Sequence, residues 1–553
     1  MISLIKKLSD YKTEKVSLAA VIISVSSFLS FLLGLLRDRL LTSTFGAGNE
    51  LDVYYTSFRI PDFVAMVFMM GAISVAVIPI FTENLIKDKK KAFDYFANLL
   101  NLFLIILTVI CSILFIFAPL LISVIAPGFS PEKKEIAVML TRIMFFSPII
   151  MGASNMISAV LMVFKRFLIT SFSPILYNLG SIIGILLFVP YFGISGLAYG
   201  IILGALMHFF IQVPALFELG FKFKNSFSFL DKDFILTLKL TIPRAIGLAA
   251  NQINLIIITA IGSLLAAGSV TIFNLANDLA MPIIGLIAIP FSTAVFPVFS
   301  MLISKGDRKG FLDRFYITAK QILFLIIPIS GLCYILRAHL VRVVFGAGLF
   351  DWSATKLTAA CFGIFMIGLS AQGLIYLLSK SFYALKNTVI PATVSLVSIA
   401  ILPFLAMTFV HFLKYENAFS NSLIYILRID QVSNLAVLAL PLAMSIDSIL
   451  QIIILMLFFK SKVKEFEFSK LSGFVLKVII ATIITVFLDY LIRQVFGGYL
   501  GSERLWVLLL QTSIVGSLGL IIYMIVAYFM KIEEVKHLRD YIITQTGFLN
   551  SKK

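Results

Sequence analysis

Six ionisable side chains lie between two long apolar runs near the start of the chain: Arg37, Asp38, Arg39, Asp52, Arg59 and Asp62. A charge at membrane depth costs roughly 2.5–3.5 kcal/mol, so such a residue normally faces a partner or a water-filled cavity. Asp52, Arg59 and Asp62 have spacings of seven and three residues, which puts them on one stripe of a helix. Pro61 favours a local break there, because its ring removes one backbone hydrogen bond. We therefore expect this hairpin to line a polar cavity in a transporter. The alternative for Arg37 and Arg39 is that they only extend to the membrane interface from a helix end.

A second polar stripe follows on the seventh apolar run. Arg244 and Asn251 are seven residues apart, with Gln252 beside Asn251 and Asn254 three residues beyond it. This stripe either binds substrate or makes hydrogen bonds between helices, which are worth about 0.6 kcal/mol each in membranes. For Arg244 we favour substrate binding.

Other polar residues lie in or beside later apolar runs. The eighth run carries Asn274, Asn277 and Asp278. Arg142, Lys320 and Asp447 fit local ion pairs or interfacial positions better than substrate contacts.

The sequence contains no catalytic or metal-binding pattern. It has no defensible Ser–His–Asp arrangement, no phosphate loop of the Walker type and no HExxH motif. The four histidines form no ligand pair, and Cys111, Cys333 and Cys361 are scattered in apolar stretches, so we expect them in the core. The sequence thus predicts a transporter rather than an enzyme, with no catalytic residues, no metal and no cofactor.

The elements that must position these residues are membrane helices. Of 553 residues 60% are hydrophobic and only 13% charged, against roughly a quarter charged in soluble proteins. A spanning helix needs about 20 apolar residues. About fourteen runs qualify, at 17–43, 51–83, 94–125, 137–164, 168–190, 194–218, 234–264, 269–303, 314–345, 354–384, 387–413, 433–459, 471–496 and 505–530. The predicted fold class is an all-α polytopic membrane protein.

The loops alternate in charge. Lysines and arginines cluster in every second loop, at 87–91, 165–166, 222–232, 305–314, 380–386 and 460–470. Loops 44–51, 190–194 and 264–269 carry none. The positive-inside rule then places both termini in the cytoplasm, which requires an even number of helices. The net charge of +17 is spread over these loops, so we expect no nucleic-acid partner.

An internal repeat divides the chain. Residues 74–82 (SVAVIPIFT) match residues 292–300 (STAVFPVFS), and Phe164-Lys165 matches Leu385-Lys386 at about the same offset. Six helices separate the copies, so they have the same orientation, as in a parallel repeat. The predicted organisation is a cytoplasmic segment at 1–16, six-helix lobes at 17–218 and 219–459, two added helices at 460–530, and a cytoplasmic amphipathic tail at 531–553.

Several of these motifs together resemble the MurJ (MviN) family of lipid II flippases, which belongs to the superfamily of polysaccharide flippases and MATE antiporters. The similar segments cover most of helices 1–11 and are Gly34-Leu-Leu-Arg37-Asp38, Phe45-Gly46-Ala47-Gly48 with Asp52, Phe58-Arg59-Ile-Pro61-Asp62, Gly71-Ala72 with Ala76 and Pro79, Ala126-Pro-Gly-Phe-Ser130, Ser173-Pro-Ile-Leu-Tyr-Asn178 and Asn251-Gln-Ile-Asn254. The architecture of that family is also fourteen helices in two lobes plus an extra pair.

The resemblance implies export of lipid II, the undecaprenyl-diphosphate-linked disaccharide-peptide used for peptidoglycan, by alternating access across the bacterial cytoplasmic membrane. The lobes would rock around a cationic cavity, and helices 13 and 14 would form a groove for the lipid tail. Arginines suit a diphosphate because they are always charged and donate in pairs. We expect a monomer driven by a coupling ion or the membrane potential. The expected substrate-binding residues are Arg37, Asp38, Asp52, Arg59, Asp62, Arg244, Asn251, Gln252 and Asp278.

The chain departs from the family at several cationic positions. The family usually has Arg where this chain has Phe31 and Ala65-Met66, and an acidic residue where it has Met70. The family's cavity Arg of helix 8 falls at Asn277 or Asp278. The alternative is therefore a related flippase or antiporter that exports another polyprenyl-linked glycan or a small molecule. A membrane glycosyltransferase would need a large outer loop with catalytic acids, and the loop at 414–433 holds only Glu416 and Asp430.

Overall fold

The computed structural model describes residues 16–70, 77–430, 432, 434–499 and 505–535, and within these ranges it contains helices and no strand. The chain forms two compact units, Met1–Thr271 with Ala347–Phe350, and Ile272–Gly346 with Asp351–Lys553. Helix α13 therefore belongs to unit 1, whereas the predicted lobe boundary lay before it, at 218/219. The domain boundaries drawn from the sequence stay a prediction.

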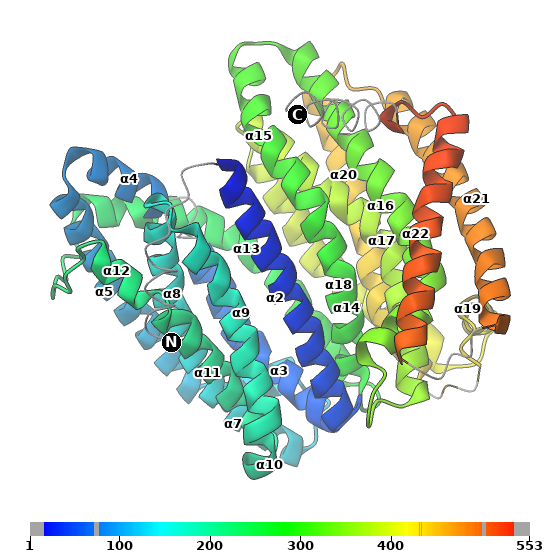
Figure 1. Cartoon of the computed structure of the whole chain (residues 1–553), viewed down its shortest axis with the longest axis horizontal. Helices are drawn as coiled ribbons and strands as arrows, with labels where there is room; N and C mark the ends of the chain where they lie inside the picture. Colours follow the sequence, from blue (N-terminus) through cyan, green and yellow to red (C-terminus); the bar gives the residue numbers. More distant parts are fainter. Residues whose placement is uncertain (1–15, 71–76, 431, 433, 500–504, 536–553) are drawn as a thin grey trace, which may run out of the picture. The chain divides into compact units, whose positions relative to one another are not determined.

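In its described residues, unit 1 contains twelve α-helices and two π-helical segments; Figure 1 shows their arrangement within the unit. They are α2 Val16–Phe45, α3 Asn49–Val64, a π-helix at Ala65–Met70, α4 Ile78–Lys87, α5 Lys89–Ile116, α6 Ala118–Ile125, α7 Pro131–Met144, α8 Phe146–Val163, α9 Phe167–Ile183, a π-helix at Gly184–Phe188, α10 Val189–Phe192, α11 Ser195–Phe210, α12 Val213–Glu218 and α13 Lys232–Ser263.

Unit 2 begins inside α14 and contains the remaining helices. They are α14 Ser269–Leu286, α15 Ala288–Ser304, α16 Arg308–Phe345, α17 Trp352–Ala384, α18 Val389–Lys414, α19 Ala418–Leu427, a 3-10 helix at Leu435–Leu438, α20 Ala439–Lys462, α21 Ser469–Tyr499 and α22 Leu505–Phe529.

Eleven helices in the described part of the chain are long and apolar enough to cross a membrane: Lys89–Ile116, Pro131–Val163, Phe167–Phe192, Ser195–Glu218, Ser269–Ser304, Arg308–Phe345, Trp352–Ala384, Val389–Lys414, Leu435–Lys462, Ser469–Gln494 and Leu505–Phe529. The other three predicted spans coincide with α2, with α3 and α4, and with α13. The prediction of an all-α polytopic membrane protein is confirmed, and the count of fourteen stays a prediction.

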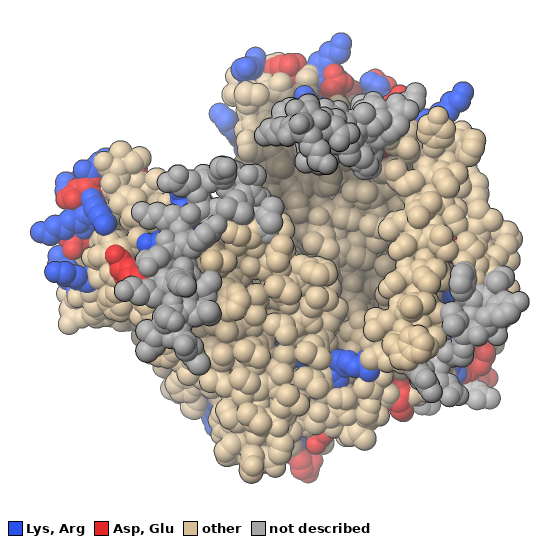
Figure 2. Space-filling view, in the orientation of Figure 1, with Lys and Arg blue, Asp and Glu red and all other residues tan. Residues whose placement is uncertain are grey.

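The basic loops of each unit gather at one end. In unit 1, Lys224 in the loop before α13 forms an ion pair of 3.0 Å with Asp94 near the start of α5, and Lys89 lies 6.0 Å from the ring of Phe164. In unit 2, the Tyr316 hydroxyl near the start of α16 accepts from the backbone N–H of Glu467, just before α21. Figure 2 shows charged side chains near helix ends and a broad uncharged surface between them. This sorting agrees with the alternating loop charges, and the sidedness of the termini stays a prediction.

Features at matched positions support the predicted repeat. Phe81 and Phe299, the eighth residues of the matched nine-residue segments, each pack edge-to-face on a phenylalanine twelve residues later, with ring centroids 5.9 and 5.0 Å apart. Lys165 and Lys386 both adopt left-handed backbone conformations, with φ of 60° and 58°. Each lies between a long helix and the next, where a left-handed residue commonly ends a helix.

The two matched helices are also both interrupted. The break expected at Pro61 lies a few residues later, because α3 continues through Pro61 and passes into the π-helix Ala65–Met70. Residues 71–76, which include Gly71, Ala72 and Ala76 of the family pattern, lie outside the described residues. In unit 2, α14 contains Pro282 and ends at Leu286, and the single residue Ile287 separates it from α15.

Glycines allow close packing within unit 1. Helix α9 lies beside α11 (Figure 1), and a Cβ added to Gly180 would lie 2.3 Å from the Cα of Gly204. Small residues of this kind let membrane helices approach closely. Helix α2 packs on the same α9, where the Asn178 amide donates to the Ser30 carbonyl at 3.0 Å. This packing fixes α2, which carries the first of the predicted site residues.

The two C-terminal helices pack on unit 2. Helices α21 and α22 contact each other and α16 around Phe324, Val478 and Tyr523. Ile532 and Val535, the first apolar residues of the predicted tail, are buried in the same cluster. The rest of the tail and residues 1–15 lie outside the described residues. Cys111 and Cys361 are buried, as expected for core residues, whereas Cys333 is only half-buried, so the expectation does not hold fully for it.

Candidate functional site

The first part of the candidate site is an ion pair on α2. The Arg37 guanidinium contacts the carboxylate of its neighbour Asp38 through two nitrogens, at 2.7 and 2.9 Å. The Arg37 side chain is 24% exposed and that of Asp38 only 6%. A buried carboxylate beside a buried cation offsets part of the cost of removing both charges from water. Arg37 is thus held in the unit and still partly accessible. Arg39 is half-buried and interacts with other residues of the chain. This observation fits a residue that lines a cavity and a residue at the membrane interface equally well.

The second part lies on α3. Arg59 is buried, with 8% of its surface exposed, and its Nε donates to the Thr259 hydroxyl of α13 at 2.7 Å. A threonine hydroxyl is neutral, so this bond positions the guanidinium without cancelling its charge. Asp62 is half-buried one turn further along α3, and the charges of both Arg59 and Arg37 act on its carboxylate. The predicted one-stripe relation between Arg59 and Asp62 is therefore present in the structure.

Tyrosines complete this cluster. Tyr54 of α3 interacts electrostatically with Arg37, Asp38 and Asp62, and Tyr177 of α9 acts on Tyr54 in turn. We refer to Arg37, Asp38, Tyr54, Arg59, Asp62 and Tyr177 as the unit 1 polar cluster. Its cations can attract an anion, and its carboxylates can hold those cations in place when no anion is bound.

Asp52 has a different environment. Its carboxylate accepts three hydrogen bonds from the start of α14 and the turn before it: from the N–H groups of Gly268 and Thr271 at 2.7 and 2.8 Å, and from the Thr271 hydroxyl at 2.7 Å. Asp52 is 3% exposed. A carboxylate that satisfies first-turn N–H groups stabilises the helix terminus and its dipole. Asp52 therefore joins α3 to the start of α14, and this geometry supports a structural role.

The remaining expected site residues are placed less closely. Arg244 and Asn251 lie on α13, and their side chains are outside the described set. Gln252 is buried on the same helix, and Asn254 is half-buried with interactions of its own. Asp278 is half-buried on α14 in unit 2, where it interacts with other residues. The structure thus brings together Arg37, Asp38, Arg59 and Asp62 of the expected set.

Several polar partners could not be identified from the sequence. Thr259, Tyr54 and Tyr177 are ordinary residues of apolar runs, although Tyr177 lies in the noted segment 173–178. A buried network in unit 1 was also missed. In it, the Ser154 hydroxyl bonds to the His208 ring at 2.7 Å, and the Gln212 amide donates to Ser154 at 2.9 Å. The only available signal was the presence of polar residues one turn apart inside an apolar run.

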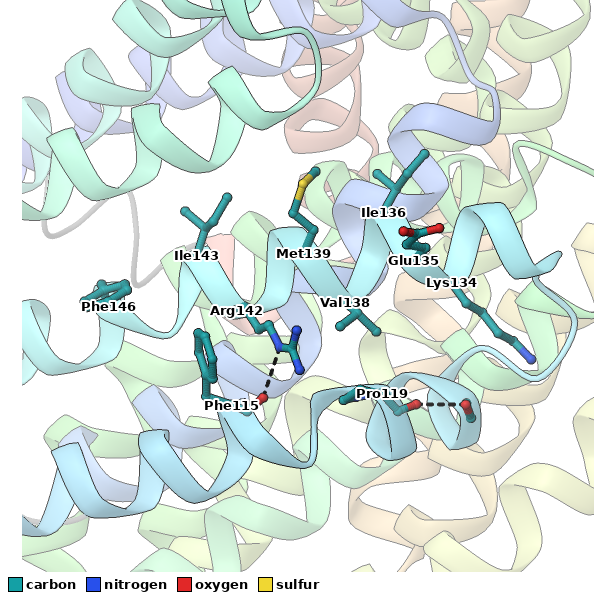
Figure 3. A pocket seen from close by; sticks show the side chains of 11 residues that line it. Phe115, Pro119, Lys134, Glu135, Ile136, Val138, Met139, Arg142, Ile143 and Phe146 are labelled. Carbon is teal, nitrogen blue, oxygen red and sulfur yellow. Dashed lines mark hydrogen bonds between the residues drawn. The ribbon is translucent and has the colours of Figure 1, made fainter.

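A groove of about 730 Å³ in unit 1 lies apart from the polar cluster (Figure 3). Arg142 of α7 lines it, and its Nε donates to the Phe115 carbonyl at 3.2 Å while its guanidinium lies 5.1 Å from the Phe115 ring. Most other lining residues are apolar, among them Met139, Ile143 and Phe146. Arg142 therefore has a local structural partner, as expected for an interfacial residue.

Comparisons with known proteins agree with the fold. Residues 41–510 match the family model described as lipid II flippase MurJ. A probable lipid II flippase MurJ of Buchnera aphidicola subsp. Baizongia pistaciae is 27% identical over 402 residues, which cover 71% of this chain and 78% of that protein. A probable lipid II flippase MurJ of Borreliella burgdorferi is 26% identical over 379 residues, 68% of this chain and 74% of that protein.

Solved structures share the fold. Lipid II flippase MurJ in an inward closed conformation has a TM-score of 0.72 at 24% identity, over 94% of this chain and 100% of that one. An inward-facing multidrug resistance MATE transporter of the MOP superfamily has a TM-score of 0.61 at 14% identity, over 81% of this chain and 98% of that one. Because the family model matches most of its length, the chain belongs to the MurJ family of lipid II flippases.

Proposed function

We propose that this protein translocates lipid II from the inner to the outer leaflet of the bacterial cytoplasmic membrane by alternating access. Family membership and the unit 1 polar cluster are the observations that support it. The cluster carries the proposal because it holds two permanent cations, Arg37 and Arg59, that act on one carboxylate, Asp62. A diphosphate needs such donors in a site from which water is largely excluded.

The cluster suggests how the site exchanges partners. Asp38 holds Arg37, and Asp62 faces Arg59 and Arg37. An arriving diphosphate competes with these carboxylates for the guanidinium groups. Because Thr259 holds Arg59 through Nε, the guanidinium keeps its position during that exchange. A coupling ion or the membrane potential would return the cluster to its starting state after transport. We assign that step to Asp62.

The other parts of the site are assigned more generally. Arg244, Asn251 and Gln252 of α13 would contact the sugar or the diphosphate, and Asp278 would line the path from unit 2. Asp52 we assign to holding the start of α14 rather than to contacting substrate. The lipid tail would lie on the exposed apolar faces of α21 and α22, for example at Phe487, which is 60% exposed, and Ile521, which is 54% exposed. We propose a monomer with both termini in the cytoplasm.

This chain lacks several arginines that the family usually has, so fewer cations are available to bind the diphosphate. Phe31 and Met66 are each 38% exposed in unit 1, so they offer apolar surface where the family has charge. Arg37, Arg59 and Arg244 must then hold the diphosphate with fewer partners. This predicts strong dependence on each remaining arginine.

Complementation tests the proposed function. The chain is expressed in a bacterium depleted of its own lipid II flippase, and lipid II is scored on the outer leaflet. Restored growth with lipid II on the outer leaflet is the expected result, and the Arg37→Ala/Arg59→Ala double variant at equal abundance is the matched control. Growth failure with lipid II retained in the inner leaflet, at normal abundance, would contradict the function.

A further inference from the structure

A second cationic cavity lies in unit 2, far in sequence from the unit 1 polar cluster. Its volume is about 320 Å³, in the range of roughly 300–1,000 Å³ typical of small-molecule sites. Four cations line it, from α16, α17, the end of α19 and α21: Arg337, Lys356, Arg428 and Arg493. The aromatic residues Tyr334, Trp352 and Tyr490 also line it. No acidic residue is among the lining residues that the structure describes.

The four cations are held by neutral groups. Arg337 donates to the carbonyls of Tyr334 and Leu427, at 2.7 and 2.9 Å. Lys356 donates to the backbone carbonyl of Asp430 at 3.2 Å, and Arg493 to that of Ile335 at 3.1 Å. Carbonyls orient these groups without cancelling their charge. None of the ion pairs found among the described residues includes any of the four.

Asp489, a buried acidic group that acts on one of these cations, is not among the residues that line the cavity. Asp489 is fully buried on α21 and acts electrostatically on Arg493. Its carboxylate faces α22, since a Cβ added to Gly519 of that helix would lie 3.2 Å from Asp489 Oδ1. Asp351 accepts a hydrogen bond from the Ala354 N–H at the start of α17, and Asp430 is exposed next to Ile429. Neither is among the lining residues, so the charged side chains that line the cavity are all cations.

Aromatic rings fix the guanidinium groups. Arg337 lies 4.5 Å from the Tyr334 ring centroid, and Arg428 and Arg493 lie 5.7 and 6.0 Å from the Tyr490 ring centroid. The Arg428 guanidinium also donates to the Tyr490 hydroxyl at 3.3 Å. Rings at these distances hold a cation over their faces, so the cations are positioned before an anion arrives.

The surroundings indicate that the anion is carried by a lipid. On α21, the helix of Tyr490 and Arg493, Leu491 is 43% exposed, and the cavity-lining Ile426 is 57% exposed. These apolar side chains offer a path for acyl or prenyl chains next to the cations. The cavity also lies at the end of α16 opposite its basic N-terminal loop, where lipid headgroups meet a membrane helix.

We propose that this cavity binds the phosphate-bearing headgroup of an anionic membrane lipid. Phosphate oxygens would contact Lys356, Arg428 and Arg493, and the lipid chains would follow α21. The site does not depend on lipid II being the transported substrate, because an anionic phospholipid and a polyprenyl diphosphate present the same chemistry. It lies in unit 2, whereas the paired arginines proposed for transport lie in unit 1.

The chain provides its own reporter. It has two tryptophans, and Trp352 lines the cavity. Trp506 is 59% exposed on α22, so Trp506→Phe leaves Trp352 as the single tryptophan at little structural cost. This protein is placed in phosphatidylcholine nanodiscs and its emission is followed during three separate titrations, with phosphatidylglycerol, undecaprenyl diphosphate and inorganic phosphate. Native mass spectrometry counts the bound lipids in parallel.

The proposal predicts a saturable change in Trp352 emission with at least one of the two lipids. The lipid that acts identifies the source. Lys356→Gln with Arg428→Asn should weaken binding by about a hundredfold, at about tenfold for each lost charge-assisted contact. Asparagine is chosen at 428 because Arg428 has φ of 54°, a conformation that Asn tolerates. Arg142→Gln, which removes a ring-stacked arginine from unit 1, is the matched control and should leave binding unchanged.

Three results would overturn the proposal: no response to either lipid, a response to inorganic phosphate alone, or equal lipid binding by the double variant. If the double variant does not fold, Arg428→Asn alone replaces it, because Arg428 is exposed and its loss leaves no buried group unpaired. That variant should bind about tenfold more weakly, and unchanged binding would equally overturn the site.

Discussion

Replacement of Arg59 is the perturbation whose effect follows most closely from the geometry. The guanidinium is 8% exposed and its Nε is already bonded to Thr259, so a ligand can engage it only through the terminal nitrogens. This allows at most one bidentate contact to a diphosphate. A charge-assisted bond is worth roughly 1.5–3 kcal/mol, and 1.4 kcal/mol is a factor of ten. Arg59→Ala should therefore reduce export by about ten- to a hundredfold.

Two variants separate binding from positioning. Arg59→Lys keeps the charge and loses the paired donors, so it should restore export only in part. Thr259→Val keeps the guanidinium and removes its neutral anchor. That bond is donated by a charged group and is worth at most about 1.5–3 kcal/mol, so export should fall by no more than about ten- to a hundredfold. The assay measures membrane abundance and outer-leaflet lipid II side by side, with Arg39→Gln as the control that should cost much less.

If Arg59 and Asp62 form a purely structural ion pair, we expect the opposite result. Arg59→Ala would then lower the amount of folded protein, because the Asp62 carboxylate would lose a compensating charge, and adding Asp62→Ala would restore it. Normal abundance with lost export supports substrate binding. Normal export by Arg59→Ala would refute the reasoning outright.

Three further predictions address structure and topology. Asp52→Ala should lower thermal stability and abundance, because each buried N–H that loses its acceptor at the start of α14 costs about 1–3 kcal/mol. Asp52→Asn should cost less, and a melting temperature of Asp52→Ala equal to that of the wild-type protein would contradict the structural role. Glu50→Cys should react with an impermeant thiol reagent from outside the cell and Lys90→Cys should not, since both are exposed and lie at opposite ends of unit 1; the reverse pattern would overturn the orientation. Gly204→Ala should reduce folded protein, because its Cβ would lie 2.4 Å from the Tyr177 carbonyl oxygen, whereas Gly473→Ala, which has open space, should not; equal abundance of the two would argue against the close approach of α9 and α11.

The fold was largely predictable because each membrane-spanning helix is a long run of apolar residues, which can be recognised in the sequence. The polar stripe of Arg59 and Asp62 was also predictable, since helical spacing alone sets it. The position of the break was not: Pro61 stays inside α3, and the π-helix begins at Ala65, where the residues themselves give no turn signal.

Partners distant in sequence could not be predicted. Asp52 bonds to residues 216 and 219 positions away, and Arg59 to a threonine 200 positions away. Spacing within one helix shows which residues share a face, but not which residue of another helix faces them. For that reason a carboxylate that holds the start of α14 was grouped with residues that face a substrate.

Transport of lipid II by the purified protein tests the central claim most directly. The protein is reconstituted into vesicles that contain fluorescent lipid II, and the fraction reachable by an impermeant quencher is followed over time. We expect protein-dependent equilibration of lipid II between leaflets, and its loss in the folded Arg37→Ala/Arg59→Ala variant. Equilibration at the same rate in that variant, or none with the wild-type chain under any imposed ion gradient or membrane potential, would contradict the account.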